Sequence, residues 1–213
     1  MSWIFRADRR CVGGGGAVWD GFAYDPEANL VYVGTGNAEP WVQKFRGAQN
    51  LDNLYTCSIL AVDLTTGQLK WYYQTVPNDN WDYDSVQQLM LLDLNINGRM
   101  RKVITQAPKN GFFYVLDRVT GKVLLGKPFT DTPWARELGP DGHPIILNND
   151  GSKVCIPDNW GGTNFMPPSF DPALRLFFVT ARETCATYLP EKLVSAPGRI
   201  FLSGTIRRDL EKA

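Results

Sequence analysis

Short apolar runs with the composition of β-strands recur along the chain, separated by turn-forming residues. Leu30–Val33, Ser58–Val62 and Phe112–Leu116 are rich in β-branched and aromatic side chains. Asp25–Asn29 contains the Pro and Asn that favour a turn. Further strands are expected at Phe22–Tyr24, Leu69–Tyr73, Val103–Thr105 and Leu176–Val179. Because no segment sustains the helical period of about 3.6 residues, the pattern predicts an all-β fold.

Two internal repeats organise these runs. Ala61–Leu69 (AVDLTTGQL) resembles Val115–Val123 (VLDRVTGKV), and Tyr24–Pro26 and Phe170–Pro172 each precede an apolar run. A spacing of roughly 50 residues, with about four short strands per repeat, is typical of propeller blades. In the shared Asp-x-x-Thr-Gly sequence, we expect the Asp to cap a tight turn and the Gly to adopt a conformation that a β-carbon opposes. About three four-stranded antiparallel blades would fit, too few to close a ring, so we expect a fragment of a longer protein.

Charge and hydropathy exclude several classes of partner. The 213 residues include 22 basic and 22 acidic side chains, for a net charge of +0. This balance does not favour nucleic acid or an anionic membrane surface. The longest apolar runs are far shorter than the roughly 20 residues of a membrane span, so no span is expected in this chain. Met1–Arg10 is charged and lacks the apolar core of a signal peptide. We expect both ends of the chain to be internal positions of a longer protein.

The stretch Asn78–Asp84 concentrates acidic side chains, because Asp79, Asp82 and Asp84 lie within six residues. Carboxylates this close repel one another unless a cation lies between them or one of them holds a proton. A hard cation such as Ca²⁺ prefers oxygen ligands of this kind. A carboxylate with a shifted pKa could instead act as a general base. An exposed turn without chemistry is the alternative that the stretch alone leaves open.

Three further positions could carry chemistry, each with a structural alternative. Trp19 follows the glycines Gly13–Gly16, which would let a flat ligand approach the backbone and stack on the indole, or would simply form a connection beside a core Trp. Asn37 ends Gly34–Asn37 and could offer its side-chain oxygen to a hard cation or hold a left-handed turn. Lys109 precedes an expected strand and could donate to an anionic or quinone oxygen, or be solvated.

The cysteines exclude two common cofactor sites. Cys11, Cys57, Cys155 and Cys185 form no CxxC and no CxxCH sequence, so zinc-ribbon and c-type haem sites are not expected. Cys155 and Cys185 flank a compact turn and strand and could form a disulfide in an oxidising compartment. Two buried thiols fit the spacing equally well.

Five motifs follow one another through most of the chain, from about Gly13 to Tyr188. They are Gly13–Gly21, Val33–Asn37, Asn80–Asp84, Ala107–Phe112 and Gly161–Phe165. In order and spacing they resemble the quinoprotein alcohol and methanol dehydrogenases, which carry pyrroloquinoline quinone (PQQ) on an eight-bladed β-propeller of the tryptophan-docking type. The resemblance implies that residues 1–213 form one partial propeller domain, with N-terminal and C-terminal blades missing.

The resemblance also implies a role for individual side chains. Trp19 looks like the indole that stacks under the quinone plane, and Asn37 like a ligand of the metal that polarises the quinone carbonyl. Asp82 looks like the catalytic base that takes the alcohol proton, and like a further metal ligand. Lys109 resembles the cation that contacts the quinone oxygens. Asn164 resembles a further contact at the rim of the cofactor.

Several residues refine or weaken this match. Asp84 resembles the extra carboxylate of lanthanide-using members, so it is a third expected metal ligand and leaves Ca²⁺ and a lanthanide ion as alternatives. Ala17 stands where many members have a Thr that bonds the cofactor, and Phe165 where Trp is frequent. Cys155 and Cys185 stand where some members form a disulfide, which favours a bridge between them.

The leading interpretation is a segment of a periplasmic PQQ-dependent alcohol dehydrogenase. It would oxidise a primary alcohol to an aldehyde and pass electrons to a cytochrome c or a membrane quinone. A non-catalytic binding or assembly propeller is the alternative, although it needs none of the active-site motifs; a sugar dehydrogenase or glycosidase-like propeller would rest on the paired carboxylates alone. The family's glutamate metal ligand has no counterpart here, and Ca²⁺ takes about 6–8 oxygens. The isolated chain is therefore expected to be inactive.

Overall fold

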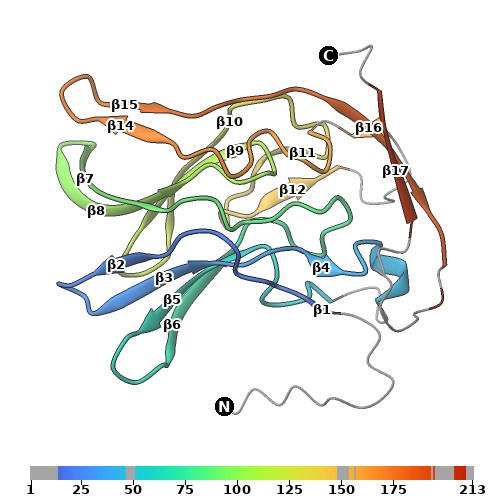
Figure 1. Ribbon diagram of the computed structural model, residues 1–213. Coiled ribbons are helices and arrows are strands. Elements are labelled where there is room, and N and C mark those ends of the chain that lie inside the picture. The colour runs from blue at the N-terminus through green and yellow to red at the C-terminus, as the bar shows by residue number, and fades with distance from the viewer. Residues whose placement is uncertain are drawn as a thin grey trace.

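Two four-stranded antiparallel sheets form the centre of the molecule (Figure 1). The computed structural model describes residues 14–46, 51–147, 154–155, 157–192, 194 and 204–209. The first sheet, blade 1, has the strand order β2 (Ala23–Asp25), β3 (Leu30–Gly34), β5 (Ser58–Asp63) and β6 (Leu69–Gln74). The second, blade 2, runs through β7 (Met90–Ile96), β8 (Arg99–Gln106), β9 (Phe112–Asp117) and β10 (Val123–Pro128).

Shorter pairings surround the two blades. β1 (Gly14–Gly15) pairs with β4 (Ala38–Glu39), β11 (Ala135–Leu138) with β12 (Pro144–Ile146), and β14 (Ser169–Asp171) with β15 (Leu176–Phe178). β13 (Val154–Cys155), β16 (Cys185–Pro190) and β17 (Gly204–Asp209) form a three-stranded sheet. In the described ranges the helical structure is one 3-10 turn, Gln43–Phe45.

The predicted all-β fold is confirmed, and two of the expected four-stranded blades are complete within the described residues. Blades 1 and 2 are the four-stranded sheets of the described residues, whereas the region of the third expected blade contributes the β14–β15 hairpin. Phe177 of β15 packs against Phe113 of β9, with ring centroids 4.6 Å apart. The hairpin therefore lies beside blade 2, as Figure 1 also shows.

The repeated Asp-x-x-Thr-Gly sequences form the predicted turns. Asp63 Oδ1 accepts hydrogen bonds from the backbone of Thr65 and Thr66, at 3.1 and 2.9 Å. Asp117 Oδ1 does the same for the two residues at the matching positions of blade 2, at 3.1 and 3.0 Å. Gly67 and Gly121 then adopt positive φ angles of 68° and 73°. These angles are open to Gly because it has no β-carbon.

Trp71 joins the two blades in the manner expected of a tryptophan-docking propeller. It comes from β6 of blade 1, and its ring lies over Gly121, the turn glycine of blade 2: a β-carbon there would be 2.6 Å from Trp71 Cε3. The indole Nε1–H also donates to the backbone oxygen of Arg118, at 3.2 Å. The turn of one blade is thus a docking site for the tryptophan of its neighbour.

A buried ion pair strengthens the same interface. Arg118 of blade 2 lies 2.8 Å from Asp25 of blade 1, measured from Nε to Oδ2, and both side chains are buried. The hydroxyl of Tyr32 donates to the backbone oxygen of Arg118, at 2.8 Å. Burial and the nearby Asp25 carboxylate raise the pKa of Tyr32 to about 12, so its hydroxyl keeps its proton. These contacts fix the relative position of the blades.

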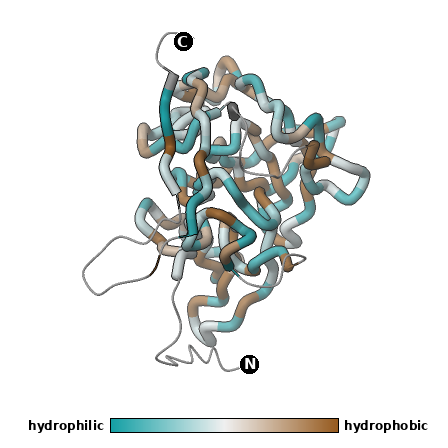
Figure 2. The backbone as a smooth tube through the Cα atoms, turned by 90° about the vertical axis from the view of Figure 1, so that its right-hand side faces the viewer, coloured by the Kyte–Doolittle hydropathy of each residue, from teal (hydrophilic) through white to brown (hydrophobic). Residues whose placement is uncertain are grey.

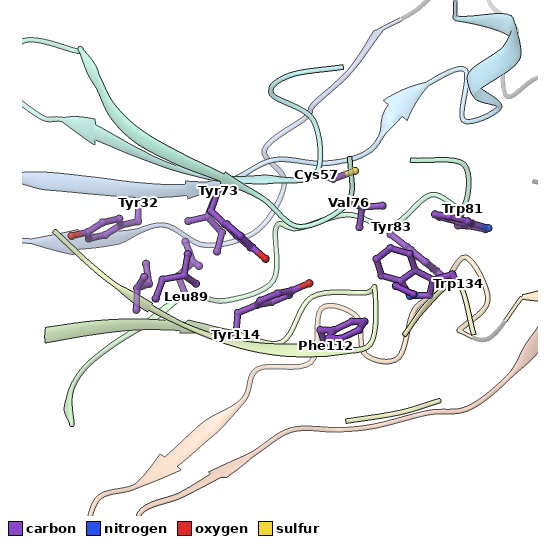
Figure 3. Close-up of a cluster of buried hydrophobic side chains, with 14 of the residues drawn as sticks. Tyr32, Cys57, Tyr73, Val76, Trp81, Tyr83, Leu89, Phe112, Tyr114 and Trp134 are labelled. Carbon is purple, nitrogen blue, oxygen red and sulfur yellow. The ribbon is translucent and has the colours of Figure 1, made fainter. Parts of the chain in front are cut away.

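An aromatic core fills the space between the blades and the loops at one end of them (Figure 3). Tyr73 of β6 faces Tyr114 of β9, with centroids 5.4 Å apart. Trp134 packs against Trp81 and Phe112, at 5.3 and 5.9 Å. Because rings from both blades and from the loop around Trp81 meet here, this core sets the position of that loop.

Hydrophobic and hydrophilic positions alternate along much of the backbone tube (Figure 2). In β2 and β3 the burial pattern alternates residue by residue, because successive side chains of a strand point to opposite faces. Within the described residues, no helix has the length and apolar character needed to cross a membrane.

Candidate active site

Five loops meet at one end of the blades through a series of backbone hydrogen bonds. The backbone N–H of Gly36 donates to the backbone oxygen of Ala17 at 2.9 Å, and that of Ser85 to the backbone oxygen of Thr35 at 3.0 Å. In the same way, the N–H of Lys109 donates to the backbone oxygen of Asp84 at 3.4 Å, and that of Gly162 to the backbone oxygen of Lys109 at 2.8 Å. The loops belong to the five motifs noted in the sequence, which lie far apart along the chain. The fold therefore brings all five motifs to one place.

Asp82, Asp84 and Lys109 form a charged cluster at the centre of this series. Lys109 Nζ donates to Asp84 Oδ2 at 2.6 Å and lies 3.6 Å from Asp82 Oδ2. Lys109 and Asp84 are each 4 % exposed, whereas the Asp82 side chain is 27 % exposed. Asp82 is thus the carboxylate of this cluster that solvent or a ligand reaches most easily.

The electrostatics of the cluster follow from this geometry. Burial raises the pKa of Asp82 to about 7; the ammonium of Lys109 opposes this shift and the carboxylate of Asp84 adds to it. Burial also disfavours the charge on Lys109, but the carboxylates of Asp82 and Asp84 outweigh that effect and raise the pKa of Lys109. An acid whose pKa is close to neutral is suited to accept and release a proton.

Asn37 lies against Asp84 and completes the cluster. Its backbone N–H donates to Asp84 Oδ1 at 2.9 Å, and its amide Nδ2 contacts the backbone oxygen of Ala38 at 3.2 Å and Glu39 Oε1 at 3.3 Å. Gly36 makes this approach possible, because a β-carbon there would lie 2.7 Å from Asp84 Oδ1. Asn37, Asp82, Asp84 and Lys109, four of the predicted site residues, are therefore brought together.

Trp19 and Asn164 are linked to the cluster through the backbone of their neighbours. Trp19 follows Ala17 by two residues, and its indole is 46 % exposed. Asn164 follows Gly162 by two residues; its amide donates to the backbone oxygen of Trp160 at 2.9 Å, and its own Oδ1 accepts from the N–H of Phe165. Ala17 and Gly162, each two residues before one of them, thus stand at opposite ends of the series of backbone hydrogen bonds.

Three side chains for which the sequence predicted no individual role, those of Glu39, Asn159 and Asp79, also contact residues of the cluster. Glu39 contacts the amide of Asn37, as described above. Asn159 Nδ2 lies 3.5 Å from Asp82 Oδ2, and Arg208 Nη2 donates to Asn159 Oδ1 at 2.9 Å. Asp79 contacts the backbone of Asp82. Asp79 stood within the acidic stretch, whereas Glu39 and Asn159 carried no pattern that distinguishes them from ordinary loop residues.

The disulfide that the resemblance favoured is not formed in this structure. Cys185 is a free, buried thiol. The strand register pairs Cys155 of β13 with Ala186 of β16 instead of with Cys185. The side chain of Cys155 and the whole of Cys11 lie outside the described residues.

The donor set fits part of a cation site. Asn37, Asp82 and Asp84 supply amide and carboxylate oxygens, which hard cations prefer. Glu39 Oε2, beside Asn37, is buried and has no hydrogen-bond partner. Lys109 already neutralises Asp84, and in the described part of the chain no three His, Cys, Asp or Glu side chains are arranged to hold an ion. A complete site needs further oxygen ligands, since Ca²⁺ takes about 6–8.

The chain matches a protein-family model over more than half of its length. Residues 4–134 match "PQQ: Glucose/ethanol/alcohol dehydrogenase, beta-propeller domain". A quinohemoprotein alcohol dehydrogenase of Comamonas testosteroni is 45% identical over 185 residues, which are 85% of this chain and 26% of that protein. The quinoprotein alcohol dehydrogenase PedH of Pseudomonas putida is 38% identical over 203 residues, or 89% of this chain and 33% of that protein.

Solved structures agree with the sequence matches. The quinohemoprotein alcohol dehydrogenase ADHIIG of Pseudomonas putida superposes with a TM-score of 0.83 at 39% identity, over 91% of this chain and 30% of that one. A europium-containing methanol dehydrogenase superposes with a TM-score of 0.84 at 32% identity, over 91% of this chain and 34% of that one. The chain thus spans about a quarter to a third of the length of these relatives. It belongs to the family of PQQ-dependent quinoprotein alcohol dehydrogenases, of whose β-propeller domain it forms a part.

Proposed function

We propose that this chain is the part of a PQQ-dependent alcohol dehydrogenase that carries the catalytic base. Residues 1–213 form one partial propeller domain, and the remaining blades belong to other parts of the complete protein. The observation that carries the proposal is the charged cluster beside Asn37. In it, Lys109 Nζ lies 3.6 Å from Asp82 Oδ2 and 2.6 Å from Asp84 Oδ2. A binding or assembly propeller has no need to gather two carboxylates and an ammonium at the meeting point of five loops.

In the proposed reaction, Asp82 accepts the hydroxyl proton of a primary alcohol at its carboxylate. Its side chain is the most exposed of the cluster, so a substrate oxygen can reach it. Lys109 holds a positive charge beside it and helps to keep the carboxylate ionised when substrate excludes water. The alcohol becomes an aldehyde once its carbon has given up a hydride.

PQQ would supply the acceptor of that hydride, and a Ca²⁺ or lanthanide ion would make its carbonyl more electrophilic. Trp19 would form the floor on which the ring stacks, because its indole is exposed and it follows Ala17, whose backbone binds Gly36, by two residues. Lys109 and Asn164 would donate to polar atoms of the cofactor. Asn37, Asp82 and Asp84 would bind the metal, and Asp84 would share its oxygens between the metal and its hydrogen bonds with Lys109 and the backbone N–H of Asn37.

The partners of the complete protein follow the family. An alcohol is the substrate, and a cytochrome c or a membrane quinone takes the electrons. The relatives named above include a europium-containing methanol dehydrogenase, which supports a lanthanide ion, and Ca²⁺ stays the alternative. We propose a periplasmic location, as expected of a PQQ enzyme.

The experiment replaces the base in the protein that carries this chain. Asp82→Asn should abolish dye-linked oxidation of primary alcohols, while the PQQ content measured by absorbance stays that of the wild type. Asp171→Asn is the control, because Asp171 caps the exposed β14–β15 turn, away from the cluster. Undiminished turnover by Asp82→Asn would remove Asp82 as the base.

The 213-residue chain alone should not oxidise alcohols. Its cluster offers too few oxygens for the metal, and Lys109 occupies one of the carboxylates. Turnover by the purified chain after addition of PQQ and Ca²⁺ or La³⁺ would contradict this expectation.

A further inference from the structure

Asp82 has an unusual backbone conformation for the residue proposed as the base. Its φ angle is 66°, in the left-handed region that residues other than Gly rarely adopt. Such a conformation is unfavourable for a residue with a β-carbon, and it persists only where surrounding contacts hold it. The direction of the Asp82 side chain depends on those contacts.

One side chain, Asp79, binds the backbone on both sides of Asp82. Its Oδ2 accepts the N–H of Asp82 at 3.0 Å, and its Oδ1 accepts those of Trp81 and Tyr83 at 3.1 and 3.3 Å. Three consecutive backbone donors thus converge on a single carboxylate. This arrangement curls the chain around Asp79, while the Asp82 side chain lies 3.6 Å from Lys109 Nζ and 3.5 Å from Asn159 Nδ2.

Asp79 is itself held firmly. It is 0 % exposed, and its backbone oxygen accepts a hydrogen bond from Arg46 Nη2 at 2.6 Å. Arg46 Nη1 donates to the backbone of Pro40 and Trp41, at 2.9 and 2.7 Å. Arg46 therefore ties the acidic loop to the segment that follows Asn37.

The hydroxyls of two tyrosines fix the residues next to Asp82. Tyr188 of β16 donates to the backbone oxygen of Trp81 at 3.0 Å. Tyr83 donates to the backbone oxygen of Pro157, and its ring stacks on Trp81 at a centroid distance of 5.6 Å. The neighbours of Asp82 are anchored in the core, while its own N–H is anchored by Asp79.

We propose that Asp79 is a positioning residue, which sets the direction of the Asp82 carboxylate by binding the backbone N–H groups of residues 81–83. The inference rests on the proposed function, because it assigns Asp82 the role of base. Asp79 does not touch substrate, since it is fully buried and both of its oxygens accept backbone hydrogen bonds. It acts only through Asp82.

Asp79→Asn in the complete protein tests this role. An amide can keep one oxygen towards Trp81 and Tyr83, but its NH₂ group then faces the N–H of Asp82, and two donors cannot bond each other. We expect kcat for alcohol oxidation to fall about 10²-fold, the order of loss that follows a displacement of about 1 Å in a catalytic group. KM and PQQ content should stay close to those of Asp171→Asn, the control in another turn capped by a carboxylate.

Hydrogen exchange supplies a readout that does not depend on activity. Peptides that span residues 78–85 should exchange faster in Asp79→Asn than in wild type, whereas Asp82→Asn should leave their exchange unchanged, since Asp79 still binds the backbone. If Asp79→Asn does not fold, Asp79→Ser, which keeps a single acceptor, takes its place in every measurement.

The outcomes separate this inference from the proposed function. An active Asp82→Asn protein would overturn the proposed base. An inactive Asp82→Asn protein together with a fully active Asp79→Asn protein would overturn the positioning role alone. Loss of activity only in proportion to lost PQQ or lost folded protein would also overturn it, since Asp79 would then be structural.

Discussion

Gly67 and Gly121 form a matched pair for measuring what tryptophan docking contributes to stability. They occupy the same position of the repeated turn, with φ angles of 68° and 73°, and their turns are capped by Asp63 and Asp117 in the same way. They differ in what surrounds the position of the missing β-carbon. A β-carbon on Gly121 would lie 2.6 Å from Trp71 Cε3, whereas one on Gly67 would meet nothing within 4 Å.

The expected magnitudes follow from these two environments. Gly67→Ala should cost only the strain of a left-handed residue, about 1–2 kcal/mol. Gly121→Ala should cost the same strain and, in addition, about 1–3 kcal/mol for displacing the indole from a packed interface. Trp71 would also lose its alignment with the backbone oxygen of Arg118. The difference between the two variants, about 1–3 kcal/mol, therefore measures the docking contact.

Urea unfolding of the 213-residue chain, followed by tryptophan fluorescence, is a suitable assay. With a slope of about 2 kcal/mol per molar urea, the midpoint of Gly121→Ala should lie roughly 0.5–1.5 M below that of Gly67→Ala. Equal midpoints would refute the reasoning, because they would mean that Trp71 makes no close contact with the turn of blade 2.

Two further substitutions test the buried charges. Lys109→Met leaves Asp82 and Asp84 without their cation and should destabilise the protein by about 3–5 kcal/mol in thermal unfolding. Lys70→Met, the control in an exposed pair with Asp63, should have little effect. Similar melting temperatures for the two variants would speak against the charged cluster. Arg118→Met leaves Asp25 buried and unpaired, so the unfolding free energy from urea titration should also fall by about 3–5 kcal/mol, and a loss below 1 kcal/mol would show that the ion pair does not hold the blades.

Local signals in the sequence located several strands of both blades. The runs at Leu30–Val33, Ser58–Val62 and Phe112–Leu116 correspond to β3, β5 and β9, because composition and flanking turns are local signals. β7 was not predicted as a strand, because its sequence MLLDLNI interrupts an apolar run with the polar residues Asp93 and Asn95. Its pairing with β8 supplies hydrogen bonds that no local pattern reveals.

For the candidate site, local motifs indicated the residues but not their contacts. Lys109 was expected to face the cofactor, and the structure also pairs it with Asp84, 25 residues away along the chain. In the sequence, Asp79 is one of three acidic residues that look alike. The folded loop distinguishes it, because its oxygens accept hydrogen bonds from the backbone of its own loop. The oxygens of Asp84 instead accept from the backbone of Asn37 and the side chain of Lys109, in two other loops. The expected Cys155–Cys185 bridge was wrong for this structure because strand register, which spacing does not encode, pairs Cys155 with Ala186.

The sequence by itself determined the strands with the strongest β composition, among them β3, β5 and β9, the turns capped by Asp63 and Asp117, and the five motifs of the site, because strand propensity, turn chemistry and motif spacing are all properties of neighbouring residues. The tertiary structure alone decided which charges meet, which carboxylate is buried beneath the loop, and that Trp71 covers Gly121. The physical reason is that hydrogen bonds, ion pairs and burial depend on distances between segments far apart in the chain, and these distances exist only once the blades have packed together.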